Sequence, residues 1–294
     1  MDRVQREHRH VPMNFTARPP AKVNLDLTVV GRRDDGFHEL LSTFLRVGLT
    51  DVLKMRATEG EADRLTVTGL PGVPIRGNLV LAAVEAVRAR AGVSLPALEI
   101  ELDKRIPAAA GLGGGSSDCA SAIELAQACW GLALSPADVV DLAASLGSDV
   151  PFFATGHGAA TVAGRGERVA RADVSVAALI LLTPPIELST AAVFARYDDL
   201  GAAGGPDVDG ANDLWPAATS LEPRLPELRS ALAAATGVEW RMSGSGPTLF
   251  ALYPSIEAAV ADAQSLVNEH PATVGDCLIH AVEPDGEDPA WRFP

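Results

Sequence analysis

Apolar and polar residues alternate strictly near the start of the chain. Over residues 22–29 every second residue is apolar, and the polar residues between them include Lys22 and Asn24. A period of two is typical of a β-strand with one buried and one polar face. The pattern therefore predicts a strand over 22–29 in which Lys22 and Asn24 point to the same side.

Other segments repeat either this alternation or the three-to-four-residue spacing of a helix. They predict strands at 40–49, 52–57, 64–68, 97–102, 158–162 and 168–171, with helices at 79–91, 115–130 and 136–146. The rest of the chain predicts strands at 177–183, 238–242, 248–253 and 276–282, and helices at 190–197, 222–235 and 256–268. This order indicates an α+β protein of two lobes. We expect an N-terminal lobe over 14–172, a C-terminal lobe over 173–294 and, before both, a disordered leader over 1–13.

Composition narrows the class of protein. The chain has 294 residues, of which 47% are hydrophobic and 21% charged, as is ordinary for a globular protein with a sizeable core. It contains no apolar run near the roughly 18 residues of a membrane span and no signal peptide, so we expect a cytoplasmic protein. Cys119, Cys129 and Cys277 are odd in number and lack CxxC spacing, which favours reduced thiols.

The net charge of −14 argues against nucleic acid or an anionic membrane as the main partner. It does not exclude a small anionic substrate, whose capture depends on local cations such as Lys22, Arg76, Lys104 and Arg105.

A glycine-rich loop, PAAAGLGGGSS at 107–117, runs directly into an amphipathic helix. Helix N-termini carry unpaired N–H groups and partial positive charge, and glycines let a phosphate approach them closely. The loop is not a Walker A motif, because Ser116 and Ser117 follow no lysine, and it lacks the third glycine of a dinucleotide fingerprint. A plain glycine-rich connection remains the alternative to a site for a nucleoside triphosphate.

A kinase would also need a cation near the transferring phosphoryl group and a base near the attacking hydroxyl. Lys22 and Asp149, in the segment LGSDVPFF, are the candidates. Pattern alone leaves two plain alternatives open. Lys22 could be a solvated lysine on a strand edge, and Asp149 could be a turn residue bonded to its own backbone.

Three separated segments, PAKVNLDLTVVGRRDDGFHEL, PAAAGLGGGSSDCAS and MSGSGPTLFAL, resemble the three motifs of the GHMP small-molecule kinases, in the same order. LGSDVPFF lies where that superfamily has its aspartate. The resemblance implies a two-lobed α+β fold, with an N-terminal ribosomal-protein S5 domain 2-like lobe and a C-terminal ferredoxin-like lobe. The NL pair after the lysine, DGFHEL, the triple glycine and GSDVP are most similar to the branch that phosphorylates a cytidine diphosphate-linked methylerythritol.

The resemblance also implies roles for single residues. Asp149 would be the catalytic base, Lys22 would orient the attacking hydroxyl, and Asn24 would help to position it. ATP, brought with Mg²⁺, would bind the loop with Ser116 and Ser117 near phosphate oxygens or the metal, without a dedicated protein cage for the ion. The expected ATP-binding residues are Asn78, Lys104, Pro107, Ala108, Ala109, Ala110, Gly111, Leu112, Gly113, Gly114, Gly115, Ser116 and Ser117. For Asn78, a helix-capping role explains the residue equally well.

By the same resemblance, Phe37 and Phe194 would sandwich a cytosine, His38 would bind the edge of the base, and Thr190 would contact the same substrate. A core position is the alternative for Phe37, and a surface or structural role is the alternative for His38. Rival functions are those of a homoserine or mevalonate kinase, or of a non-catalytic nucleotide-binding module. We expect small-molecule partners only, with neither nucleic acid nor membrane, in a monomer or weak homodimer.

Overall fold

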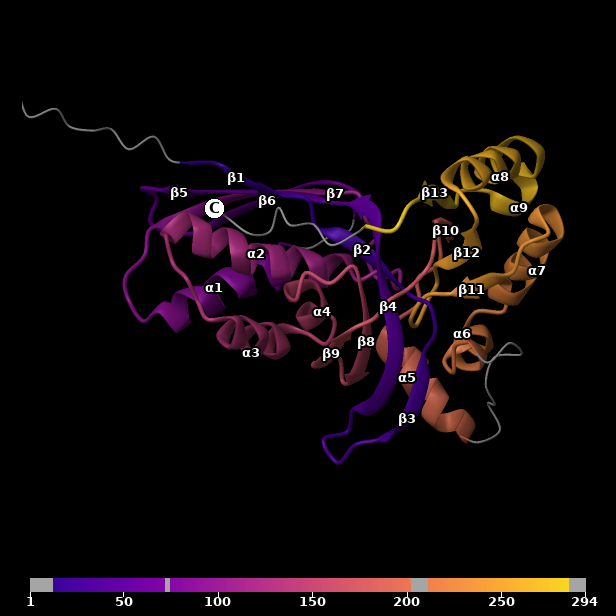
Figure 1. Ribbon diagram of the computed structural model, residues 1–294, viewed down its shortest axis with the longest axis horizontal. Coiled ribbons are helices and arrows are strands. Elements are labelled where there is room, and N and C mark those ends of the chain that lie inside the picture. Colours follow the sequence, from indigo (N-terminus) through magenta and orange to yellow (C-terminus); the bar gives the residue numbers. More distant parts are fainter. Residues whose placement is uncertain (1–12, 72–74, 202–210, 286–294) are drawn as a thin grey trace, which may run out of the picture.

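The computed structural model describes residues 13–71, 75–201 and 211–285, and shows two lobes side by side (Figure 1). Except for Met13, the predicted leader lies outside these residues. Among the described helices, none combines the length and the apolar character needed to cross a bilayer.

Within its described residues, the N-terminal lobe has two sheets and four helices. One sheet has the order β1 (Phe15–Ala17), β5 (Val52–Thr58), β7 (Ala97–Lys104), β6 (Arg64–Gly69). The other has the order β2 (Pro20–Asn24), β4 (His38–Thr50), β8 (Ala159–Gly164), β9 (Arg168–Arg171), with β3 (Thr28–Arg32) paired to β4. The helices are α1 (Leu79–Ala91), α2 (Gly114–Trp130), α3 (Pro136–Leu146) and the short α4 (Val150–Ala154), and they lie below the first sheet in Figure 1.

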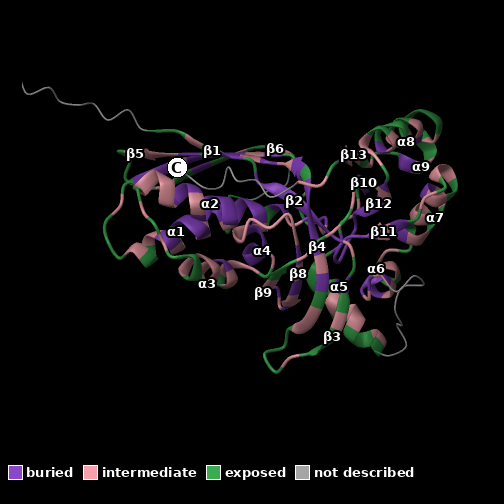
Figure 2. Cartoon of the chain, viewed as in Figure 1, coloured by how far each residue is buried: buried purple, intermediate pink, exposed green. Residues whose placement is uncertain are grey.

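The described part of the C-terminal lobe has one sheet, in the order β11 (Trp240–Met242), β12 (Leu249–Tyr253), β10 (Ala178–Thr183), β13 (Leu278–Val282). Its helices are α5 (Thr190–Leu200), α6 (Trp215–Leu221), α7 (Arg224–Thr236), α8 (Ile256–Glu269) and α9 (Pro271–Val274). The predicted lobe boundary at residue 172 falls in the connection between β9 and β10. Strand β10 is buried along its whole length (Figure 2) because it is the inner strand between β12 and β13.

Local signals placed most elements correctly. Asn78 caps α1 through a hydrogen bond that its Oδ1 accepts from the Val80 N–H at 3.0 Å. Ser135 caps α3 in the same way by accepting from the N–H of Asp138 at 3.1 Å. The sequence analysis did not predict β1, α4, α6 or α9, each of seven residues or fewer and too short for a periodic pattern.

The predicted strand over 22–29 is wrong as a single element. It divides into β2 and β3 because the chain leaves the sheet at Leu27 to meet the other lobe. The Leu27 N–H donates to the carbonyl of Ala211 at 2.8 Å, and its carbonyl accepts from Asp213 at 2.9 Å. The Leu27 side chain is buried in the core of the C-terminal lobe.

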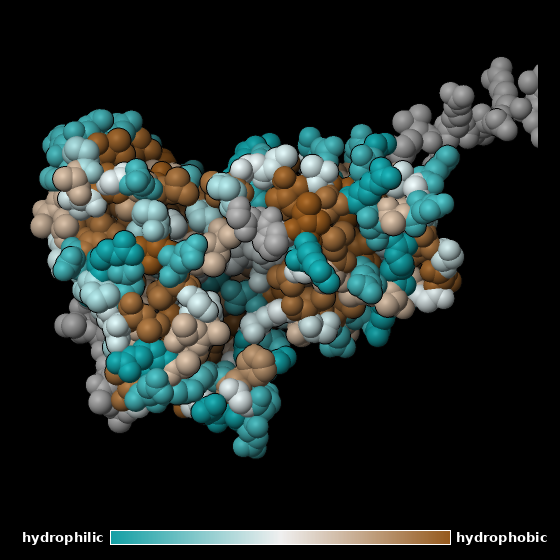
Figure 3. Space-filling view, turned by 180° about the vertical axis from the view of Figure 1, so that it is seen from behind, coloured by the Kyte–Doolittle hydropathy of each residue, from teal (hydrophilic) through white to brown (hydrophobic). Residues whose placement is uncertain are grey.

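The two lobes are joined by a hydrophobic core of their own. Apolar side chains from β2 and β4, from β10 and β12, and from the glycine-rich loop pack together there, among them Val23, Val47, Leu112, Leu181 and Phe250. The apolar side chains of the loop, such as Leu112, are therefore buried between the two lobes. From behind, apolar and hydrophilic residues are interspersed over both lobes (Figure 3).

Candidate active site

A cleft of about 820 Å³ lies at the junction of the lobes. Its volume is within the range usual for small-molecule sites. The walls are β2, the hairpin of β3 and β4, the glycine-rich loop, the turn before α4, the turn between β8 and β9, and α5. Most of the residues singled out from the sequence line this one cleft.

Lys22 and Asp149 meet in the cleft. The Lys22 Nζ lies 3.5 Å from the Asp149 Oδ2, donates to the Asn24 Oδ1 at 2.5 Å and donates to the Gly111 carbonyl at 2.9 Å. The ammonium group has three donors, so these three partners satisfy it. A cation is thus held next to a carboxylate by three separate segments of the chain.

Lys22 is only 3% exposed, so the plain alternative of a solvated edge lysine is wrong. All five residues of β2 are buried, because the glycine-rich loop and Asp149 cover Lys22 on the face that the alternation marked as polar, while the apolar face packs against the other lobe. Burial lowers the pKa of Lys22 below its ordinary value, and the charge of Asp149 acts in the opposite direction.

Asp149 stands at the N-cap position of α4, yet its side chain makes no capping hydrogen bond. Its side chain is 30% exposed. The turn role that the sequence left open predicts a carboxylate bonded to nearby backbone, which is not what the structure shows. The Asp149 carboxylate points instead toward Lys22 and is accessible from the cleft.

The glycine-rich loop forms the neighbouring wall and ends in the first turn of α2. Gly113 is the N-cap residue of this helix, with φ of +68°, a conformation that glycine adopts without strain. Pro107 to Gly111 and Gly113 to Ser116 line the cleft, whereas Leu112 is 1% exposed in the core below. The N–H groups of the first turn have no intrahelical partner, so the loop offers donors and a partial positive charge to an anion.

The loop is fixed by the third motif segment from the other lobe. The Gly111 carbonyl accepts from the Ser243 Oγ at 2.9 Å, and the Ser243 Oγ accepts from the Asn24 N–H at 3.1 Å. Asn212 holds the same turn by donating from its Nδ2 to the carbonyls of Met242 and Gly244, both at 2.9 Å. Asn212 was not predicted from the sequence, because it lies just after the polar, glycine-rich segment GAAGGPDVDG at 201–210 and looks like part of it.

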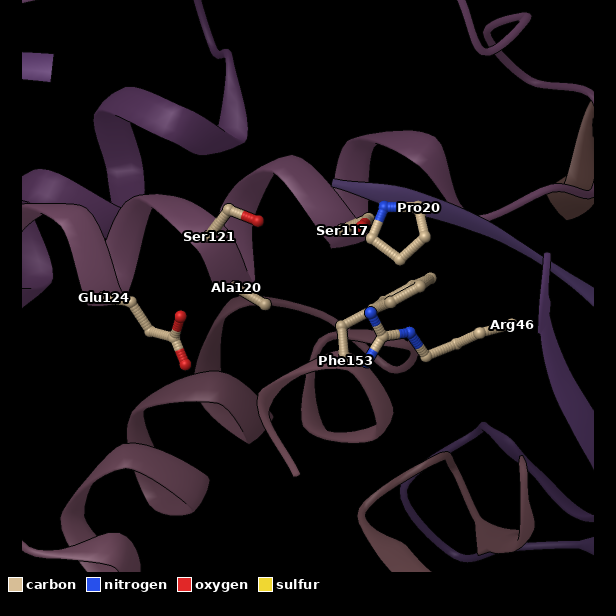
Figure 4. A pocket seen from close by; sticks show the side chains of 7 residues that line it. All are labelled: Pro20, Arg46, Ser117, Ala120, Ser121, Glu124 and Phe153. Atoms are coloured by element: carbon tan, nitrogen blue, oxygen red, sulfur yellow. The ribbon is translucent and has the colours of Figure 1, made fainter. Parts of the chain in front are cut away.

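Ser117 does not face the cleft. Its hydroxyl is buried and lines a separate cavity of about 10 Å³, room for one water molecule, together with Arg46, Ser121 and Glu124 (Figure 4). Burial raises the pKa of Glu124 to about 8, opposed by the charge of Arg46. A cation such as Arg46 so close makes this cavity unsuited to Mg²⁺. Ser116 and Asp149 are among the residues with side-chain oxygens that line the cleft next to the loop.

Asn78 and Lys104, both predicted to bind ATP, do not line the cleft. Lys104 is 3% exposed below the first turn of α2, where its Nζ donates to Asp51 and, at 2.7 Å, to Asp118. Burial raises the pKa of Asp118 to about 7, opposed mainly by Lys104. This buried group supports the loop from behind, and a role in nucleotide contact stays a prediction.

Aromatic side chains gather at the other end of the cleft. Phe37 is 50% exposed, so the alternative of a core position is wrong. The rings of His38 and Phe194 are stacked, with centroids 4.9 Å apart and planes at 24°. The His38 Nε2 lies 2.7 Å from the Asp198 Oδ1, which fixes the orientation of the imidazole. Asp198 was missed because it acts through His38, far away in sequence.

Two further side chains complete this end. The Thr190 Oγ1 lies 2.8 Å from the Ser245 Oγ, so Thr190 joins α5 to the third motif turn. Arg165, between β8 and β9, places its guanidinium 4.9 Å from the ring centroid of Phe37 and lines the cleft. The sequence analysis did not single out Arg165, because one arginine in a turn carries no signal of its own.

Comparisons with known proteins agree with this geometry. Residues 78–157 match the GHMP kinases N terminal domain, and residues 194–272 match the GHMP kinases C terminal domain. The chain is 37% identical over 271 residues to a 4-diphosphocytidyl-2-C-methyl-D-erythritol kinase of Pelotomaculum thermopropionicum, with 84% of this chain and 92% of the relative covered. The enzyme of the same name from Streptomyces avermitilis is 38% identical over 297 residues, with 92% and 97% covered.

A solved structure is also similar. The crystal structure of a 4-(cytidine 5'-diphospho)-2C-methyl-D-erythritol kinase superimposes with a TM-score of 0.74 at 30% identity, covering 92% of this chain and all of that one. The predicted two-lobed fold and small-molecule kinase activity are thereby confirmed. The protein belongs to the GHMP kinases, in the family of 4-diphosphocytidyl-2-C-methyl-D-erythritol kinases.

Proposed function

We propose that the protein transfers the γ-phosphoryl group of ATP to the 2-hydroxyl of 4-diphosphocytidyl-2-C-methyl-D-erythritol, giving the 2-phosphate and ADP in non-mevalonate isoprenoid precursor biosynthesis. The observation that carries the proposal is that one cleft joins a phosphate-binding loop, a lysine and aspartate 3.5 Å apart, and an aromatic group suited to a nucleobase.

In the proposed reaction, the hydroxyl oxygen of the acceptor forms a bond to the γ-phosphorus while the bond from that phosphorus to the β,γ-bridging oxygen breaks. The hydroxyl proton passes to the Asp149 carboxylate, which is accessible and not used as a helix cap. Lys22 turns the donor that meets Asp149 at 3.5 Å toward the reacting oxygen and favours its alkoxide character. Asn24 and the Gly111 carbonyl hold the Lys22 Nζ in place, so little rearrangement is needed during the reaction.

ATP would lie with its phosphates over the first turn of α2, where backbone N–H groups point into the cleft. Mg²⁺ would accompany those phosphates, with Ser116 and Asp149 as the oxygen donors next to it, and would neutralise part of their charge. Among the described residues, no group of three histidine, cysteine or acidic side chains could hold a metal ion alone.

The aromatic end of the cleft favours a cytidine-containing acceptor over homoserine or mevalonate. Those smaller acceptors have no base to stack, and they leave Phe37, His38 and Phe194 without a purpose. Stacking of a base on an aromatic ring contributes about 1–3 kcal/mol. A non-catalytic nucleotide-binding module would have no reason to bury Lys22 next to Asp149.

The test is an acceptor panel with Mg·ATP: the diphosphocytidyl methylerythritol, mevalonate, homoserine and galactose, with ADP formation as the readout. We expect the cytidylyl compound to be the only good acceptor, and CMP and CDP to inhibit competitively against it. Faster phosphorylation of homoserine or mevalonate would overturn the proposed substrate. If no ADP forms with any of the four acceptors, the proposed reaction is overturned.

A further inference from the structure

Arg165 lies at the aromatic end of the cleft, opposite the hairpin that carries Phe37. Its guanidinium carbon is 4.9 Å from the centre of the Phe37 ring, and both side chains line the cleft. The distance is that of a cation–π contact, which is more favourable for arginine than for lysine because the guanidinium is planar. Arg165 thus covers the ring on which a cytosine is proposed to stack.

The turn that presents Arg165 has little freedom. The Arg165 N–H donates to the Glu167 Oε2 at 2.6 Å. Arg165 stands between two glycines with positive φ, Gly164 at +78° and Gly166 at +129°. A β-carbon on Gly166 would lie only 1.9 Å from the Ser148 carbonyl oxygen. The turn is therefore packed directly against the residue that precedes Asp149, which sets the position of Arg165 relative to the reacting groups.

Charge is the second argument. Lys22 and Arg165 are the lysine and arginine side chains that line the cleft in the part of the chain that the structure describes. The Lys22 ammonium already has three partners. Among the described residues, the guanidinium of Arg165 forms no ion pair within 4.0 Å; its charge acts at longer range on Asp35 and Glu167, which Arg33 already pairs with.

The proposed acceptor carries a diphosphate between its cytidine and its methylerythritol. Such a group loses hydration on entering a protein site and needs a cation there, all the more in a chain with a net charge of −14. A guanidinium binds two phosphate oxygens at once through its parallel N–H groups, whereas an ammonium acts as a single point charge.

We propose that Arg165 is a substrate-binding residue whose guanidinium binds the diphosphate of the acceptor next to the Phe37 ring. The inference rests on the proposed function, since it names the group that the same site holds. Arg165 is then the residue that distinguishes a nucleoside diphosphate derivative from a free nucleoside, while Phe37, His38 and Phe194 bind the base.

The experiment measures the affinity of cytidine, CMP and CDP for three variants by calorimetry, with kcat and KM for the acceptor alongside. Arg165→Gln removes the charge, and Arg165→Lys keeps it without the planar fork. Arg168→Gln is the matched control, since Arg168 belongs to β9 of the same hairpin but does not line the cleft and pairs with Glu39. ATP affinity and the melting temperature show that each variant is folded.

In Arg165→Gln we expect CDP affinity to fall about 10- to 100-fold, as for loss of a charge-assisted hydrogen bond. Cytidine affinity should change less than about threefold, KM for the acceptor should rise in step with the loss of CDP affinity, and kcat should stay near the wild-type value. The CDP affinity of Arg165→Lys should lie between those of Arg165→Gln and the wild type, and the CDP affinity of Arg168→Gln should match that of the wild type.

Equal losses for cytidine and CDP would overturn the inference, because Arg165 would then only pack on Phe37. Unchanged CDP affinity in Arg165→Gln, or a loss of ATP affinity instead, would overturn it as well. A wild type that neither binds CDP nor phosphorylates the cytidylyl acceptor would overturn the proposed function, and with it this inference. The two failures are distinguishable because only the second affects the wild-type protein.

Discussion

Replacing Gly113 by alanine tests how closely the phosphate loop and Lys22 depend on each other. Gly113 has φ of +68°, and a β-carbon there would lie 3.0 Å from the Lys22 Cγ, 3.1 Å from the Lys22 Cε and 3.1 Å from the Phe153 Cε2. Ordinary van der Waals contacts of carbon begin near 3.5 Å. The new methyl group can therefore be accommodated only if the stem of Lys22 or the ring of Phe153 moves by a few tenths of an ångström.

Two costs follow from this geometry. A left-handed backbone costs an alanine about 1–2 kcal/mol, which should appear as a loss of unfolding free energy. A displacement of about 1 Å in a reacting group can cost about 100-fold in rate, so a shift of a few tenths should lower kcat roughly fivefold. We expect both effects in Gly113→Ala, measured by urea unfolding and by kcat at saturating ATP and acceptor.

Gly115→Ala is the matched control in the same loop. It has a helical backbone, and the nearest protein atom to its β-carbon would be the Leu79 Cδ1 at 3.9 Å. The free energy of unfolding should stay the same or rise by up to about 1 kcal/mol. Because Gly115 lines the cleft, KM for ATP should rise while kcat is retained. Wild-type kcat and stability in Gly113→Ala would refute the coupling between loop and lysine.

Three further substitutions test other parts of the site. Asp149→Asn should lower kcat about 100- to 10,000-fold with ATP affinity largely intact, measured by steady-state kinetics and calorimetry, and retention of a tenth of the wild-type kcat would contradict the role as base. Asp198→Ala should raise KM for the cytidylyl acceptor about tenfold with little change in kcat, because His38 loses the partner at 2.7 Å that orients it. Glu124→Gln should be as stable as the wild type near pH 4 and more stable by up to about 4 kcal/mol at pH 8. Burial raises the pKa of Glu124 to about 8, so the free energy of unfolding of the wild type falls as the pH rises from about 4.5 through that value. Urea unfolding across that range checks it, with Glu85→Gln on the exposed side of α1 as control, and equal pH profiles for Glu124→Gln and the wild type would contradict it.

Local patterns were sufficient wherever the structure is determined by neighbours in sequence. The caps Asn78 and Ser135 fixed the start of α1 and α3, and the glycines of the loop located the start of α2 within one residue. In the caps of α1 and α3, the backbone N–H and the side-chain oxygen that accepts from it lie two and three residues apart. The motifs added the order of the segments, which placed Lys22, Asp149, Phe37 and His38 in one site.

The pattern failed where a partner comes from the other lobe. Alternation over 22–29 predicted one strand, but Leu27 pairs with the segment around Asn212, and this contact bends the chain out of the sheet. Lys104 meets distant partners within its own lobe, because Asp51 and Asp118 hold its ammonium group below the loop, and its contact with ATP stays a prediction. A sequence pattern shows which residues are polar but not which distant polar groups they meet.

The polar face of β2 shows why such a failure can itself indicate function. A surface strand with alternating residues is stable because its polar side is hydrated, yet here Lys22 and Asn24 are each 3% exposed. Removing an ammonium group from water costs several kcal/mol, and well-packed apolar residues at the same place are often at least as stable. The three partners of Lys22 reduce that cost, but they do not make the arrangement better for folding than an apolar one. The closure of the glycine-rich loop and Asp149 over the polar face of this strand is therefore explained by the proposed reaction of the buried lysine and not by the stability of the fold.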